Sequence, residues 1–190
     1  MRMNVPNFLT WLRIIAIPLL MAIYYVPGHW MTMPERNLAA TVLFVAAALT
    51  DWLDGYLARR LNQQSAFGAF LDPVADKLMV AAALMMLVEL DRVSALVAAV
   101  IVGREIAISA LREWMAKVGE ARSVAVNFLG KIKTVSQMVA IPMLLYFEPI
   151  GAWFRPFQVG SWLIYLAAVL TLASMFYYLK LASPRAFRDR

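Results

Sequence analysis

Four aspartates, set between long apolar runs, are the residues of this sequence best suited to chemistry. They are Asp51, Asp54, Asp72 and Asp76. In a small, partly dry volume, four carboxylates repel one another and take up protons unless a cation joins them. Oxygen ligands suit hard ions such as Mg²⁺ or Mn²⁺, and no sulfur or imidazole lies nearby to favour zinc. We therefore expect one or two divalent ions, able to hold a diphosphate and to stabilise charge developing on it.

The spacing of these aspartates places them on two helix faces. At about 100° per residue, the first pair shares a face with the small residues Gly55 and Ala58. The second pair lies one turn apart on the next helix. The polar connection at 61–66 is short enough to make the two helices antiparallel neighbours, so the acidic faces can converge. Gly55, Ala58 and Gly68 also expose backbone, which lets a bulky ligand approach closely.

Each of these features has a structural alternative. An aspartate pair near a helix end can cap the helix or pair with an arginine. Small residues on a helix face often serve only close helix packing. Asp72, directly before Pro73, could be an N-cap with proline at the first helical position, and that role is compatible with metal ligation.

The composition predicts the elements that must position the aspartates. The chain is 63% hydrophobic, with a mean hydropathy of +0.68, whereas soluble domains are about half apolar. We expect a single all-α integral membrane domain over residues 1–190. There is no cysteine, and the single His29 lies in an expected loop, which argues against thiolate sites and a Ser-His-Asp triad. We attribute the net charge of +6 to topology and anionic headgroups, and we expect no nucleic-acid partner.

Six segments are long and apolar enough to span a bilayer, which takes about 20 residues. The first is interpreted as a retained helix, Pro142 is expected to kink the fifth, and Asp91 with Arg92 forms a tight turn between the third and fourth. The expected spans are approximately 9–25, 37–60, 68 or 73 to 90, 93–115, 124–147 and 157–179.

The basic residues orient these spans. Six spans put both termini on the same side of the membrane, and only Arg36, Arg92 and Arg155 of the 18 lysines and arginines fall on the other side. Because cytoplasmic loops are rich in Lys and Arg, both termini are expected in the cytoplasm. The four aspartates then lie near the cytosolic edge of the membrane.

The acidic stretch resembles the signature of a known family. Its pattern D-x2-D-G-x2-A-R-x8-G-x3-D-x3-D, from Asp51 to Asp76, is similar at every fixed position to that of the CDP-alcohol phosphotransferases. The resemblance implies transfer of a phosphatidyl or similar group from a CDP-linked donor to an alcohol, with release of CMP. It also implies a pair of metal ions and a homodimer.

The same resemblance implies a role for each matching residue. Asp51, Asp54 and Asp72 would ligate the metal pair that holds the CDP diphosphate, and Asp76, also near the metals, would be the general base. Three small residues would make room for the cytidine, and one arginine would steady the nucleotide phosphates or the aspartates. These are Gly55, Ala58, Gly68 and Arg59.

Two further groups of residues extend the candidate site. The N-terminal segment with Asn7, Thr10 and Arg13 resembles the start of bacterial family members, which makes Asn7 and Thr10 either donor-binding residues or helix N-caps. Four basic residues of the fourth and fifth helices could bind a second anion, with only one of the two lysines lining the pocket. They are Arg104, Arg112, Lys131 and Lys133. Positive-inside anchoring and pairing with nearby glutamates is the alternative for such residues.

A basic acceptor pocket suits an acceptor that itself bears phosphate. With the segments GREIAISALREWMA and GKIKT, nearly the whole chain resembles bacterial family members that use sn-glycerol 3-phosphate. The expected reaction transfers phosphatidyl from CDP-diacylglycerol to this acceptor, on the cytosolic side of the bacterial inner membrane. The alternatives are another phosphorylated acceptor such as inositol phosphate, a divalent-cation transporter, and a non-catalytic lipid-binding scaffold. Transport would require acidic or polar residues continuing across the membrane, and we find no such continuation in the outer halves of the expected spans.

Overall fold

The computed structural model describes the backbone of residues 5–61, 66–117, 128–151 and 153–186. Within these ranges, side chains are described except at 5–7, 52–61, 66, 67, 69, 116, 128, 129 and 178–186. Apart from one isolated bridge between Ile150 and Phe154, the regular structure of the described residues is helical.

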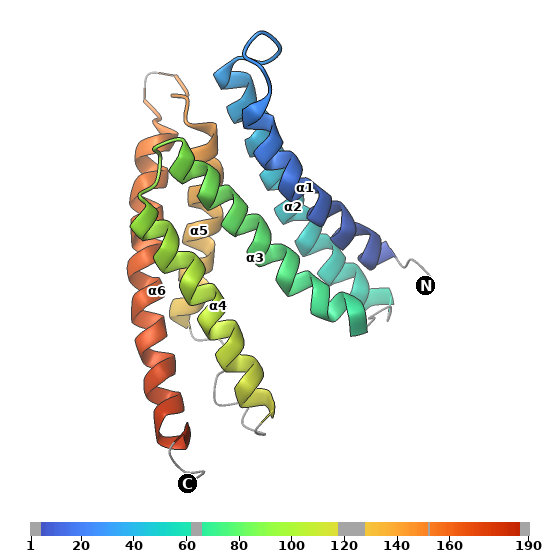
Figure 1. The fold of residues 1–190 in the computed structure, drawn as a ribbon, viewed down its shortest axis with the longest axis vertical. Helices are drawn as coiled ribbons and strands as arrows, with labels where there is room; N and C mark the ends of the chain where they lie inside the picture. The colour runs from blue at the N-terminus through green and yellow to red at the C-terminus, as the bar shows by residue number, and fades with distance from the viewer. Residues whose placement is uncertain (1–4, 62–65, 118–127, 152, 187–190) are drawn as a thin grey trace.

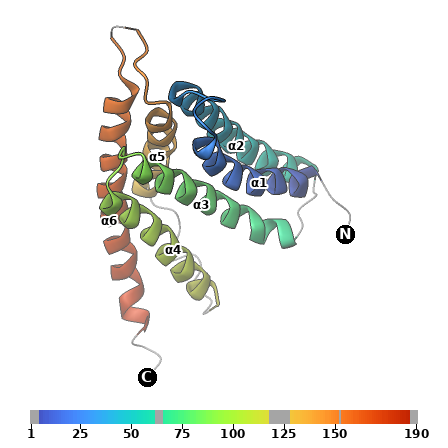
Figure 2. The same ribbon diagram turned by 45° about the horizontal axis from the view of Figure 1, so that its top comes forward.

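The described residues form six helices, which correspond to the six expected spans. They are α1 (Val5–Tyr25), α2 (Met33–Leu61), α3 (Ala66–Glu89), α4 (Ala95–Lys117), α5 (Phe128–Tyr146) and α6 (Pro156–Ala186). Figures 1 and 2 show α1 and α2 side by side on one flank, α5 and α6 on the other, and α3 between them. In Figure 1 the start of α1 and the end of α6 lie lower than the described connections after α1, α3 and α5, which lie in the upper part of the view.

Local signals in the sequence account for several helix ends. At the start of α2, the Thr32 backbone N–H and hydroxyl both donate to Glu35 Oε2, at 2.7 and 2.8 Å, a capping-box arrangement. Ser94 caps α4, and the predicted tight turn precedes it, with Asp91 in the left-handed region at φ 55°. The N-cap alternative for Asp72 is wrong, because α3 begins at Ala66 and both Asp72 and Pro73 lie inside it.

The helices pack around one apolar core, and their outer faces are apolar as well. Phe44, Leu84 and Leu144 are among the fully buried side chains of this core. Large apolar side chains are also exposed along α1 and α6, including Ile15 and Trp162. The segments Phe8–Tyr25 and Pro156–Tyr177 are long and apolar enough to cross a membrane. An exposed apolar surface of this extent is typical of a protein that associates with a membrane.

In the turn between α3 and α4, a buried arginine contacts α2, α5 and the residue that follows α5. Arg92 donates from Nη1 to the carbonyls of Leu144 and Leu145, at 3.0 and 2.8 Å, and so satisfies free carbonyls at the end of α5. Its Nη2 donates to Asn37 Oδ1 at 2.8 Å, and the guanidinium lies 4.3 Å from the ring centroid of Phe147. This end of the bundle is thus fixed by hydrogen bonds as well as by apolar packing.

Gly160 allows α5 and α6 to approach closely. A Cβ atom at this position would lie 2.9 Å from Leu144 Cγ, 3.1 Å from Met143 Cβ and 3.2 Å from the Ala140 carbonyl oxygen. These distances are shorter than normal contacts, and two of the three atoms belong to backbone or Cβ positions that move little. Glycine at 160 is therefore a packing requirement.

Gly160→Ala should lower the free energy of unfolding by about 1–3 kcal/mol, because the added methyl group overpacks the α5–α6 contact. Gly103→Ala is the matched control. A Cβ at Gly103 meets no atom within 4 Å, so this change should be neutral or stabilise the helix by up to about 1 kcal/mol. Thermal unfolding of the purified proteins in detergent tests both; equal midpoints for the two variants would contradict the packing argument.

Candidate active site

Three of the four aspartates meet α1 at one end of the bundle. Asp51 lies in α2, and Asp72 and Asp76 lie one turn apart in α3. The facing side of α1 presents two polar residues, Thr10 and Arg13, also about one turn apart. Because both pairs have this one-turn spacing, each of the two α1 residues can contact one aspartate of α3.

Arg13 joins the two acidic helices. The residue is only 2% exposed. Its Nη1 atom lies 2.7 Å from Asp51 Oδ1 and 3.3 Å from Asp76 Oδ1. One guanidinium nitrogen thus bridges carboxylates from α2 and α3, which offsets their mutual repulsion. Pairing with an arginine, the structural alternative given above for an aspartate near a helix end, is therefore present for Asp51, and the arginine belongs to α1.

Thr10 makes the second contact between α1 and the acidic helices. It is 1% exposed, and its hydroxyl donates a hydrogen bond to Asp72 Oδ1. Because α1 already includes Val5, Thr10 lies inside the helix and is not its N-cap. A hydroxyl and a guanidinium from one helix therefore orient three of the four carboxylates.

Several predicted site residues have side chains outside the described set. Asn7 lies in the α1 backbone, and four others lie in the last turns of α2. Those four are Asp54, Gly55, Ala58 and Arg59. Gly68 is described and is buried in α3.

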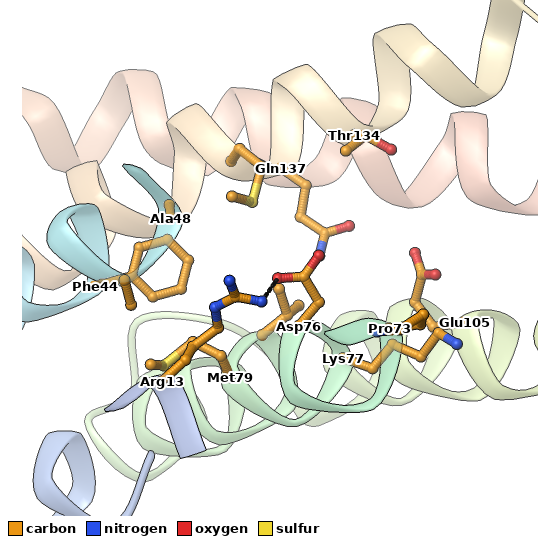
Figure 3. Close-up of a pocket in the computed structure, with 13 residues that line it drawn as sticks. Arg13, Phe44, Ala48, Pro73, Asp76, Lys77, Met79, Glu105, Thr134 and Gln137 are labelled. Carbon is orange, nitrogen blue, oxygen red and sulfur yellow. Dashed lines mark hydrogen bonds and ion pairs between the residues drawn. The ribbon is translucent and has the colours of Figure 1, made fainter. Parts of the chain in front are cut away.

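A cavity of about 210 Å³ opens beside the carboxylates (Figure 3). Five helices contribute to its walls. Arg13, Asp76 and Lys77 supply charged groups from α1 and α3, and Glu105 supplies one from α4. Figure 3 shows Asp76 on the α3 wall pointing toward Gln137, which extends from α5. The rest of the lining is formed by Phe44, Ala47, Ala48, Pro73, Met79, Val80, Thr134 and Met138.

The predicted basic residues divide into a buried pair and an exposed pair. Lys133 is buried and forms an ion pair with Glu105 Oε1. Arg104 is also buried, with Nη1 at 3.7 Å from the same oxygen and Nη2 donating to Ser174 Oγ of α6 at 2.9 Å. Glu105, which lines the cavity, therefore forms ion pairs with both of these buried cations. Arg112 and Lys131 are exposed.

Besides apolar residues, four polar residues of this cavity were not assigned to the site from the sequence. They are Lys77, Glu105, Thr134 and Gln137. Sequence signals could have identified two of them. Lys77 directly follows Asp76, and Gln137 lies four residues after Lys133, on the same face of α5.

The donor chemistry of the site fits a hard divalent cation. The described carboxylates offer only oxygen atoms, and Asp51 and Asp76 already share one positive group in Arg13. Among the side chains that the structure describes, no group of three or more acidic or histidine residues is close enough to hold an ion. The predicted ligand set includes a fourth carboxylate, Asp54, whose side chain is outside that description.

Comparison with known proteins gives two results. The model of a family described as CDP-alcohol phosphatidyltransferase matches residues 3–173. The chain is also 48% identical over 184 residues, 96% of each chain, to proteins named CDP-diacylglycerol--glycerol-3-phosphate 3-phosphatidyltransferase. Such relatives come from Escherichia coli (strain K12), Salmonella choleraesuis (strain SC-B67) and Shigella flexneri serotype 5b (strain 8401).

Proposed function

The chain belongs to the CDP-alcohol phosphatidyltransferase family, and we propose that it transfers the phosphatidyl group of CDP-diacylglycerol to sn-glycerol 3-phosphate. The products are phosphatidylglycerophosphate and CMP. The observation that supports this most strongly is the 48% identity over 96% of both chains to relatives named for this reaction. The protein is thus a transferase of phospholipid biosynthesis.

The lipid donor requires a site beside the bilayer. In the proposed topology all six helices span the bacterial inner membrane, both termini are cytoplasmic, and the aspartates face the cytosol. The exposed apolar faces of α1 and α6 support membrane insertion, and the small number of basic residues on the opposite side supports the orientation. A water-soluble acceptor then reaches the aspartates from the cytosol while the acyl chains remain in lipid. A homodimer is the predicted assembly.

Four aspartates would hold the metal ions of the proposed reaction. Asp51, Asp54, Asp72 and Asp76 supply the oxygen ligands that Mg²⁺ and Mn²⁺ prefer, and we propose two ions. When bound, these ions would neutralise the diphosphate and the charge on the departing CMP. Thr10 and Arg13 orient three of the carboxylates from α1. The cytidine would lie against Gly55, Ala58 and Gly68, with Asn7, Thr10 and Arg59 as further donor-binding residues.

Asp76 is the proposed general base. It lines the cavity, and its side chain is half exposed. The primary hydroxyl oxygen of glycerol 3-phosphate bonds to the phosphorus on the lipid side of the diphosphate. The bond from that phosphorus to the oxygen leading to CMP breaks, and the hydroxyl proton passes to Asp76. Arg13 holds this carboxylate at the cavity edge.

The acceptor phosphate is proposed to lie near Arg104, Arg112 and one of the two lysines. Burial favours Lys133 over Lys131 as that lysine, because Lys133 pairs with a cavity-lining glutamate. Lys77, which lines the cavity, adds a cation that the sequence interpretation did not include. The phosphate would then lie between α3, α4 and α5, away from the diphosphate of the donor.

An acceptor panel tests the reaction itself. Purified protein with Mg²⁺ and CDP-diacylglycerol should release CMP with sn-glycerol 3-phosphate roughly tenfold or more faster than with inositol phosphate, serine or glycerol, because only phosphorylated acceptors of the right size satisfy the basic groups. CMP release and lipid product should be equal in amount. A faster reaction with inositol phosphate, or a rate of CMP release that does not depend on the acceptor, would contradict the proposal.

Asp76→Asn should lower kcat by about 10²–10⁴-fold while the protein still folds, because the amide cannot accept the hydroxyl proton. Asp91→Asn is the matched control. Asp91 lies in the exposed α3–α4 turn at the other end of the bundle, and asparagine tolerates its positive φ. Its kcat should equal that of the wild type. A near wild-type rate for Asp76→Asn would mean that another group is the base.

A further inference from the structure

Gln137 places a buried amide in the cavity, and the reaction described above gives it no task. The residue is 4% exposed and lies in α5. Its Oε1 atom is buried and has no hydrogen-bond partner among the residues that the structure describes. Buried polar groups are nearly always hydrogen-bonded, because an unsatisfied one loses its water without compensation. Gln137 lines the cavity, and the unpartnered oxygen at the end of this side chain therefore points to a ligand that brings a donor.

The surroundings of Gln137 define the geometry of that ligand. Figure 3 shows its side chain pointing toward Asp76 across the cavity. A carboxylate repels the amide oxygen and attracts the NH₂ group, so Oε1 is left for a donor other than Asp76. One turn earlier on α5, Lys133 pairs with Glu105, which lines the same cavity. A molecule with its phosphate toward that pair and one hydroxyl at Asp76 would have its middle beside Gln137.

From this arrangement we propose that Gln137 accepts a hydrogen bond from the non-reacting C2 hydroxyl of sn-glycerol 3-phosphate and so determines acceptor specificity. The inference rests on the proposed function. The acceptor has three polar positions, and each meets a different group of this chain. The phosphate meets the basic residues, the C1 hydroxyl meets Asp76, and the C2 hydroxyl meets Gln137 Oε1. The contact with Gln137 holds the C1 hydroxyl in register with the base.

A substrate that lacks only the C2 hydroxyl tests the contact. The probe is 3-hydroxypropyl phosphate, which keeps the phosphate and the primary hydroxyl. Wild-type protein should use sn-glycerol 3-phosphate with a kcat/KM roughly 10–100-fold higher, because the analogue leaves a buried acceptor unpaired. In Gln137→Met, which keeps the side-chain length and removes the acceptor, the two substrates should differ by no more than about threefold. The ratio should decrease because the variant has a lower kcat/KM for sn-glycerol 3-phosphate, and not because it has a higher kcat/KM for the analogue.

The matched control is Thr171→Val. Thr171 is also buried with an unpartnered oxygen in the described part of the chain, but it lies in α6 and does not line the cavity. This variant should keep the wild-type preference. The control separates loss of a substrate contact from loss of any buried polar group.

The outcomes distinguish this inference from the proposed function. If the wild type transfers phosphatidyl to neither acceptor, the proposed function fails. If the wild type is active but uses both acceptors equally, or if Gln137→Met keeps the wild-type preference, only the role of Gln137 is overturned. If Gln137→Met does not fold, Gln137→Leu is measured in its place. Independently of both variants, a wild-type kcat/KM for sn-glycerol 3-phosphate that is about equal to that for 3-hydroxypropyl phosphate rules out the contact.

Discussion

The arrangement of the first three helices depends on the ion pairs that the buried guanidinium of Arg13 forms with two aspartates. Its Nη1 atom contacts Asp51 of α2 and Asp76 of α3, so a single charge from α1 brings two acidic helices together. Without a cation between them these carboxylates would repel one another. The Thr10–Asp72 hydrogen bond repeats the pattern one turn earlier. Through these two contacts, α1 holds three aspartates of α2 and α3 at one end of the folded bundle.

The two ends of the bundle have buried arginines with different surroundings. Arg92, in the α3–α4 turn, is satisfied by carbonyl oxygens of α5, by Asn37 and by the ring of Phe147, and it also lies near the titratable side chains of Tyr24 and Glu148. Arg13 at the other end contacts titratable carboxylates beside a cavity. The difference between the two arginines is their position, because Arg13 and its partner Asp76 line the cavity, whereas Arg92 does not.

The sequence predicted the helices better than the individual contacts of the candidate site. Six apolar segments predicted the six helices of the described residues, because span length and hydropathy are local properties. The spacing of Asp72 and Asp76 predicted their shared face for the same reason, whereas the side chain of Asp54 lies outside the described set. The bridging role of Arg13 and the unpartnered oxygen of Gln137 depend on how α1 and α5 pack against α3, which no local pattern specifies. The N-cap alternative for Asp72 was wrong because α3 starts at Ala66, although Pro73 usually favours a helix start.

In the proposed reaction, the carboxylates gathered by α1 form a divalent-metal site for the diphosphate of the donor. Binding of Mn²⁺ to the purified protein, followed by electron paramagnetic resonance, tests this role. We expect saturable binding by the wild type, weaker by roughly tenfold or more in Asp51→Asn and in Asp72→Asn and unchanged in Asp91→Asn. Wild-type protein that binds no Mn²⁺, or binding that survives both substitutions unchanged, would contradict it.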